Sequence, residues 1–154
     1  MMNSFDFVEN NDRPLEDAMH DVREFHKAFN HPHPTKITKI SPELKKLRAK
    51  WMMEEIQEYL DTDDIAIEMD SLADLIYFAL GSAITSGLSD EQFSHIFALV
   101  QEANMAKLFK DGKPHYNEDG KVIKPEGWIA PDEKIRKYIE EIISSENKQE
   151  SFLK

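Results

Sequence analysis

Residues 41–87 decide the fold of this chain, and they read SPELKKLRAKWMMEEIQEYLDTDDIAIEMDSLADLIYFALGSAITSG. Ser41 followed by Pro42 is a strong helix start, because the serine can cap the helix and proline fits its first turn. Gly87 favours a helix end, and the polar cluster Asp61-Thr62-Asp63-Asp64 favours a short connection. The stretch therefore predicts two helices in series, over about 42–60 and about 64–86.

Both of these helices carry carboxylates at helical spacing. Glu54, Glu55 and Glu58 fall within an arc of about 100° on the first helix, and Asp70 and Asp74 share a face of the second. Like charges at this spacing repel, so packing the two acidic faces together calls for a cation between them. Carboxylate oxygens suit Mg²⁺ or Mn²⁺, and such ions usually act on phosphate oxygens. The other reading is a solvated acidic face, which is common in a chain with 30 Asp and Glu.

The surroundings of the aspartates favour the metal reading. Residues 65–81 are mostly apolar nearly all the way round, as expected of a helix buried in a bundle. Asp74 lies in the middle of this run, and buried carboxylates are almost always paired or bound to metal. A ferritin-type iron site would need a Glu-x-x-His motif, and no histidine follows a glutamate of these helices at that spacing. The residues therefore predict a metal site whose ligands are all oxygen atoms.

Composition limits the partners and the compartment. Nineteen Lys and Arg against 30 Asp and Glu give a net charge of −11, which argues against nucleic acid and against an anionic membrane surface as partners. Without cysteine the chain has no disulfides, which fits a reducing compartment. We see no signal-peptide pattern and no apolar window long enough to span a membrane. We expect a cytoplasmic single domain over 1–154, with its core at about 10–144.

The rest of the chain adds three helices and little strand signal. We expect Asp12 to cap the first helix and the capping box Ser89-x-x-Gln92 to open the fourth. Two Asp-Gly steps predict turns around a short ribbon, and the tail 146–154 is polar enough to fray. The remaining helices are expected over about 13–29, 90–107 and 131–144. The prediction is an all-α bundle of four to five helices with an irregular or hairpin segment around 108–130.

Amide and ammonium donors gather after the fourth predicted helix. Asn104 and Lys107 share one helix face, and glycine-containing loops with more lysines follow. Lysine binds phosphate as a point charge. A triphosphate held between Mg²⁺ and these side chains would therefore account for both the acidic helices and the lysines that follow them. The candidates for binding phosphate are Asn104, Lys107, Lys121 and Lys124. The candidates for stacking on a base are Phe25, His26, Trp51, Tyr77 and Trp128.

The motifs follow one another in a definite order: Arg48, Glu54-Glu55-x-x-Glu58, Asp70-Ser71-Leu72-Ala73-Asp74, Gly81-x-Ala83, Gly87, Asn104-Met105-Ala106-Lys107-Leu108 and Asp119-Gly120-Lys121-Val122-x-Lys124-Pro125. This order resembles the MazG-like nucleotide pyrophosphohydrolases, an all-α superfamily that includes phosphoribosyl-ATP pyrophosphohydrolase and dimeric dUTPases. The resemblance covers about residues 10–140. It implies Mg²⁺-dependent cleavage of a nucleoside triphosphate to a monophosphate and pyrophosphate, with Mn²⁺ as a possible substitute.

The resemblance also implies roles for the carboxylates. Glu55, Glu58 and Asp74 are the expected metal ligands, with Glu54 as the alternative to Glu55. Whichever of Glu54 and Glu55 is not fully engaged by metal would orient or deprotonate the attacking water. The family pattern has an acidic residue where this chain has Ser71. We expect Asp70, its neighbour, to substitute as a metal ligand.

Three hypotheses follow. The first is a nucleoside triphosphate pyrophosphohydrolase, and the second is a phosphoribosyl-ATP pyrophosphohydrolase using the same metal site. The third is a non-catalytic acidic module that binds metal or nucleotide, which Ser71 keeps open. A helix that is apolar on both faces exposes hydrophobic surface in a single chain, and the resemblance implies a homodimer or homotetramer.

Overall fold

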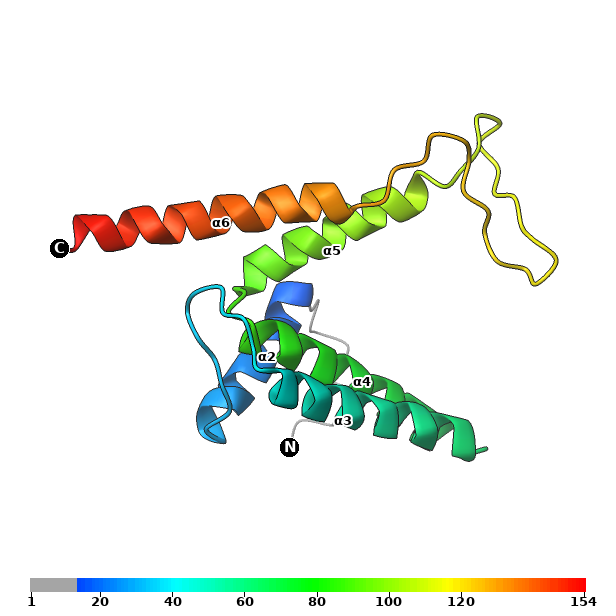
Figure 1. Cartoon of the computed structure of the whole chain (residues 1–154). Helices are drawn as coiled ribbons and strands as arrows, with labels where there is room; N and C mark the ends of the chain where they lie inside the picture. The colour runs from blue at the N-terminus through cyan, green and yellow to red at the C-terminus, as the bar shows by residue number, and fades with distance from the viewer. Residues whose placement is uncertain (1–13) are drawn as a thin grey trace, which may run out of the picture. The chain divides into compact units, whose positions relative to one another are not determined.

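The computed structural model describes residues 14–154, and this part of the chain is all-α (Figure 1). It holds no β-strand, only an isolated antiparallel bridge between Tyr116 and Val122. The chain divides into two compact units, one ending at Phe93 and the other covering Ser94–Lys154. The single domain expected over 1–154 stays a prediction. The helices are α2 (Leu15–Ala28), α3 (Pro42–Asp61), α4 (Ile65–Thr85), α5 (Asp90–Met105) and α6 (Asp132–Phe152).

Local signals set the ends of α3 and α4, and the predicted bounds are correct to within one residue at each end. Ser41 Oγ accepts a hydrogen bond from the Leu44 backbone N–H at 3.2 Å. Asp64 caps α4 in the same way, its Oδ1 accepting from the Ala66 N–H at 2.9 Å. Each bond satisfies a backbone donor that has no partner within the helix. The two helices pack side by side as an antiparallel hairpin (Figure 1).

Glycine is required at the end of α4. Gly87 has a φ of +83°, and a Cβ there would collide with the carbonyl oxygen of Lys36. The Thr38 backbone N–H donates to the Ser86 carbonyl at 2.9 Å, so the segment before α3 lies against this helix end. Only a residue without a side chain permits both the left-handed backbone and this close approach.

The core of the first unit is made by α2 and α4. Met19 and Val22 of α2 are buried, as are Leu80 and Ile84 of α4. Arg23 also anchors α2. Its guanidinium donates from Nη2 to the Leu88 carbonyl at 2.8 Å and to Asp90 Oδ1 at 2.9 Å. Apolar packing and one charged pair therefore hold α2 in place beside the hairpin.

Two expectations about helix ends need correction. Within the described residues the first helix begins at Leu15, and Pro14 precedes it without a side-chain cap; Asp12 lies outside the described residues. The last helix, α6, continues to Phe152 and includes most of the tail that was expected to fray. The sequence after Ser144 contains no glycine or proline and is rich in Glu, Lys and Gln, which are good helix formers.

The irregular segment between α5 and α6 contains a short ribbon, but its two sides flank the Asp119-Gly120 turn, whereas the ribbon was expected between the two Asp-Gly steps. Ile123 N–H donates to the His115 carbonyl at 2.7 Å, and Asn117 N–H donates to the Lys121 carbonyl at 2.9 Å. The capping box before α5 is reciprocal, with Ser89 N–H bonded to Gln92 Oε1 and Gln92 N–H to Ser89 Oγ. Across residues 14–154, no helix by itself has the length and apolarity to cross a membrane. Only α4 and α5 taken together meet that test of length and composition.

Candidate active site

Arg48 fixes how α3 lies on α4. Its side chain is 3% exposed, and it donates from Nε to Ser82 Oγ at 2.8 Å and from Nη2 to the Phe78 carbonyl at 3.1 Å. The two helices are antiparallel, so equal steps from the Arg48–Ser82 bond toward the α3–α4 connection reach residues at the same level. Two turns along α3 lead to Glu55, and two turns along α4 lead to the turn that contains Asp74. The hairpin register therefore brings the two predicted acidic faces to the same level.

Glu55 is the centre of the acidic cluster, which we define as Glu55, Glu58, Asp70 and Asp74. Burial raises the pKa of Glu55 most, followed by the negative charges of Asp74 and Glu58, a hydrogen bond with Glu58 and the charge of Asp70. Among the described residues, Glu55 Oε2 is buried and has no hydrogen-bond partner. Such a carboxylate is stabilised by taking up a proton or by binding a cation.

Glu54 stands apart from this cluster. Its side chain is exposed, and Lys50, one turn earlier on α3, approaches it with Nζ at 3.6 Å from Oε1. Glu54 is not among the groups that shift the pKa of Glu55. Of the two catalytic candidates, Glu55 therefore lies within the cluster and Glu54 lies outside it, next to a lysine.

Ser71 lies at the position where the resemblance to the MazG-like family implies an acidic residue. Its side chain is 1% exposed, and in the described part of the chain its Oγ has no hydrogen-bond partner. Asp70, the expected substitute, is exposed and acts on the pKa of Glu55, although as the smallest of the contributions. The buried hydroxyl of Ser71 thus directly follows Asp70, a member of the acidic cluster, on α4.

The donor chemistry suits a hard divalent ion, but the side chains do not form a ready ligand set. Within residues 14–154, no three acidic, His or Cys side chains come together in a geometry that could hold a metal ion. The buried oxygen of Glu55 without a partner is the feature of this structure that a bound cation would satisfy. Carboxylate and hydroxyl oxygens are the ligands that Mg²⁺ and Mn²⁺ prefer.

An aromatic group adjoins the acidic cluster. Trp51 precedes Glu55 by one turn of α3, and Tyr77 follows Asp74 by nearly one turn of α4. The Phe25 ring meets Tyr77 edge-on at 5.6 Å, and Trp51 lies 5.7 Å from Phe78. Of the five predicted aromatic candidates, the first unit thus holds all but Trp128. His31, 6.5 Å from Trp51, and Phe78 complete the group; neither was predicted, because no local pattern distinguishes them.

His26 is the buried member of this aromatic group. It is 2% exposed, and its Nδ1 lies 2.7 Å from the Pro32 carbonyl, so Nδ1 carries the proton and donates. Burial is the main cause that lowers the pKa of His26, and the charge of Arg48 adds to it. Gly81 passes close to both groups. A Cβ at Gly81 would lie 2.5 Å from Arg48 Nη2 and 2.8 Å from His26 Nε2.

Three of the four predicted phosphate-binding residues gather around Trp128 in the second unit. Lys107 Nζ donates to Asn104 Oδ1 at 2.8 Å. The ammonium groups of Lys107 and Lys124 lie 5.4 Å and 4.6 Å from the centroid of the Trp128 ring. Lys121 lies in the turn of the ribbon, where its backbone N–H donates to Asn117 Oδ1 at 2.8 Å.

Comparison with known proteins identifies the family. The model of the phosphoribosyl-ATP pyrophosphohydrolase family matches residues 22–104, which include both acidic helices and Asn104. The chain belongs to this family. It is therefore a pyrophosphohydrolase, a hydrolase that acts on phosphoric anhydride bonds.

Several solved structures are similar to this chain. One of them is described as a "putative NTP pyrophosphohydrolase" from Exiguobacterium sp. 255-15, and it is 27% identical over 87% of this chain and 99% of that chain, with a TM-score of 0.49. No curated protein sequence matches the chain. Lys107, Lys121 and Lys124 lie beyond the residues that the family model matches.

Proposed function

We propose that this protein is a Mg²⁺-dependent nucleoside triphosphate pyrophosphohydrolase that releases a nucleoside monophosphate and pyrophosphate. The observation that carries the proposal is Glu55, with a buried oxygen that lacks a partner and with three further carboxylates acting on its pKa. A fold that keeps such repulsion between α3 and α4 gains most if a divalent cation neutralises it. Mn²⁺ is the expected substitute, because it takes the same oxygen ligands.

Each acidic residue has a proposed role. Glu55, Glu58, Asp70 and Asp74 would hold the ion, and a bound divalent ion polarises phosphoryl oxygens and lowers the pKa of coordinated water. Glu54 or Glu55 would orient the attacking water and accept its proton. Glu54 suits this role because it is exposed and directly precedes Glu55, with Lys50 Nζ 3.6 Å from its Oε1. Glu55 suits it because its pKa is raised, and a carboxylate with a raised pKa binds a proton more tightly.

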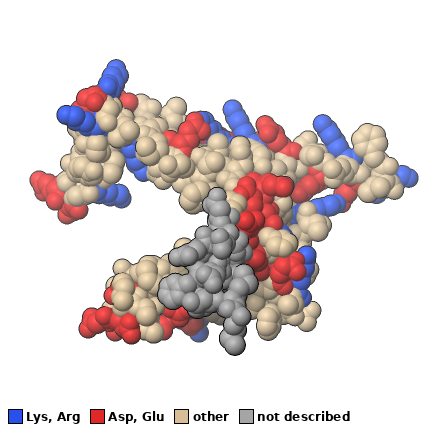
Figure 2. Space-filling model, turned by 180° about the vertical axis from the view of Figure 1, so that it is seen from behind, with Lys and Arg blue, Asp and Glu red and all other residues tan. Residues whose placement is uncertain are grey.

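The overall charge of the chain does not attract the phosphates of the substrate. At a net charge of −11 the protein repels a triphosphate at long range, so attraction has to come from the metal and from local lysines. Acidic side chains gather near the end of the α3–α4 hairpin in the view of Figure 2. Asn104, Lys107, Lys121 and Lys124 are the proposed phosphate-binding side chains.

A second candidate function is hydrolysis of phosphoribosyl-ATP, which the matched family model favours by its description. It would use the same acidic cluster and the same lysines, because both substrates carry a triphosphate. The two candidates differ only in the group attached to the phosphates. Substrate profiling therefore separates them, whereas site mutations do not.

We also propose a homodimer or homotetramer in the cytoplasm, with a nucleotide as ligand and neither nucleic acid nor membrane as partner. Apolar side chains of the α3–α4 hairpin remain exposed in a single chain, including Met53 (59%), Leu60 (67%), Ile65 (65%) and Ile76 (58%). The N-terminal half of α4, Asp74 included, was expected to be buried but is mostly exposed among residues 14–154. A second copy of the chain would cover this surface.

The test is turnover on a panel of canonical and deoxy nucleoside triphosphates and phosphoribosyl-ATP with Mg²⁺, with products separated by ion exchange. Monophosphate with pyrophosphate from a nucleoside triphosphate supports the proposal. Diphosphate with orthophosphate refutes the bond assignment, and turnover of phosphoribosyl-ATP alone favours the second candidate. Glu58→Gln and Asp74→Asn should abolish turnover with the fold intact, while Glu43→Gln, an exposed acid at the far end of α3, should leave it unchanged.

A further inference from the structure

We infer that Trp128 is a positioning residue that holds Lys107 and Lys124 together as one phosphate-binding pair. The inference rests on the proposed function, because it assumes that the lysines meet a phosphate chain. Both ammonium groups lie over the same indole ring, at 5.4 Å and 4.6 Å from its centroid. One residue therefore brings together two cations that come from different parts of the segment between α5 and α6.

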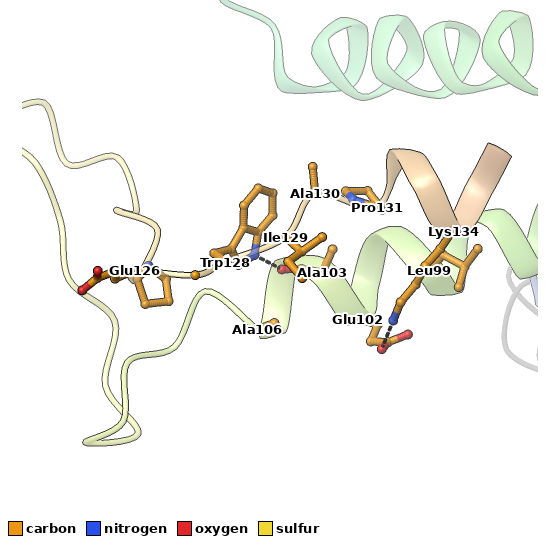
Figure 3. Close-up of a pocket in the computed structure, with 12 residues that line it drawn as sticks. Leu99, Glu102, Ala103, Ala106, Glu126, Trp128, Ile129, Ala130, Pro131 and Lys134 are labelled. Carbon is orange, nitrogen blue, oxygen red and sulfur yellow. Dashed lines mark hydrogen bonds and ion pairs between the residues drawn. The ribbon is translucent and has the colours of Figure 1, made fainter. Parts of the chain in front are cut away.

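The ring itself is fixed from two sides. Its Nε1–H donates to the Ala103 carbonyl at 2.7 Å, an acceptor in the last turn of α5 that has no partner within the helix (Figure 3). Its backbone N–H donates to the Pro125 carbonyl at 3.1 Å. The indole also forms one wall of a cavity of about 340 Å³, whose other walls include Leu99, Ala106, Ile129 and Pro131. Trp128 is thus bonded to the scaffold before any ligand arrives.

The electrostatics explain why an aromatic ring suits this task. Two ammonium groups brought close together repel each other, whereas the negative face of an indole attracts each of them. Asn104 Oδ1 accepts from Lys107 at 2.8 Å and fixes one ammonium group further without neutralising it. A carboxylate in the place of the ring would gather the lysines equally well but would cancel the charge that a phosphate needs.

Glu102, an acid in the same part of α5 as Asn104, pairs with another lysine. Glu102 lies in the last turns of α5, close to Asn104 in sequence, and it could compete for a lysine. Its Oε1 instead accepts from Lys134 of α6 at 2.7 Å (Figure 3). Glu102 is therefore engaged by Lys134, and the ammonium groups of Lys107 and Lys124 retain N–H donors for phosphate oxygens.

The first measurement is the chemical shift of the lysine ε-methylene groups in ¹H–¹³C spectra of the full chain. Protons over an indole face move upfield, so two lysines should show upfield ε-protons, assigned with Lys107→Met and Lys124→Met. Trp128→Leu should return both to ordinary values while the helical circular dichroism is retained. If the wild-type spectrum shows no upfield pair, or if Trp128→Leu leaves the pair in place, the inference is wrong.

The second measurement is the affinity for inorganic triphosphate by titration calorimetry. Trp128→Leu, Lys107→Met and Lys124→Met should each weaken binding by about tenfold. Trp128→Phe keeps a ring but loses the N–H, so it should fall between wild type and Trp128→Leu. Phe109→Leu removes the ring that stacks on His115 in the same segment and should leave binding unchanged.

These results separate the inference from the proposed function. Equal losses in Trp128→Phe and Trp128→Leu would show that the ring only supports the local fold, which overturns the positioning role. Unchanged triphosphate affinity in Trp128→Leu would overturn it as well. If triphosphate binding falls as expected but no nucleotide is turned over, the proposed reaction is wrong and the role of Trp128 stands.

Discussion

Arg48 on α3 and Ser82 on α4 are joined by a hydrogen bond of 2.8 Å from the guanidinium Nε to the serine Oγ. The guanidinium is buried, and its Cζ lies 5.5 Å from the centroid of the Trp51 ring. Burial lowers the pKa of Arg48. The hairpin that carries the acidic cluster is thus held in register by an arginine whose partners are a hydroxyl and a carbonyl.

Arg48→Ala should reduce the free energy of unfolding by about 3 kcal/mol, because it leaves a cavity and removes the bonds that join α3 to α4. Lys46→Ala, an exposed cation on the same helix, should change it by less than about 0.5 kcal/mol. Urea unfolding monitored by circular dichroism gives both values. An Arg48→Ala variant as stable as wild type would show that the guanidinium does not hold the register.

Gly81→Ala should destabilise the protein by about 1–3 kcal/mol, although alanine is the better helix former. The added Cβ would lie 2.5 Å from Arg48 Nη2 and 2.8 Å from His26 Nε2. The double variant Gly81→Ala/Arg48→Ala should be more stable than the sum of the single changes predicts, because the space that Arg48 vacates accepts the methyl group. Strict additivity in denaturant unfolding would contradict this explanation.

Ser71→Ala should leave stability unchanged or raise it by up to about 1 kcal/mol, because the buried hydroxyl has no partner among the described residues. Ser82→Ala is the matched control. Its Oγ accepts from Arg48 and donates to the Phe78 carbonyl at 2.8 Å, so its loss should cost about 1–2 kcal/mol. If Ser71→Ala is the more costly of the two, the Ser71 hydroxyl binds a water or an ion.

The raised pKa of Glu55 predicts a pH dependence of stability. In the folded state this carboxyl binds a proton more tightly than in the unfolded chain, where its pKa is about 4.5. The contribution of Glu55 to the free energy of unfolding is therefore greatest below pH 4.5, and it is lost as the pH rises through the pKa of the folded state. The melting temperature of Glu55→Gln relative to wild type should accordingly increase with pH across that window. Saturating Mg²⁺ should remove the difference by stabilising wild type, and no effect of Mg²⁺ would contradict the metal proposal.

The sequence determined the helices and the candidate residues, because their signals are local. Ser41-Pro42, Asp64 and Gly87 set the ends of α3 and α4 through caps and a left-handed backbone that depend on neighbours a few residues away. Helical spacing likewise placed Glu55 with Glu58 and Asp70 with Asp74. Local reasoning was wrong about α6, whose tail was judged by its polarity rather than by its strong helix formers.

Only the tertiary structure decided which of these residues meet. The level of Glu55 against Asp74 depends on the bond between Arg48 and Ser82, which lie 34 residues apart, and nothing in either helix alone specifies it. Lys107 and Lys124 share an indole because Trp128 bonds to Ala103, 25 residues earlier in the chain. Helix formation depends on short-range hydrogen bonds and on the spacing of apolar residues, whereas a site requires long-range packing that brings distant side chains to the same place.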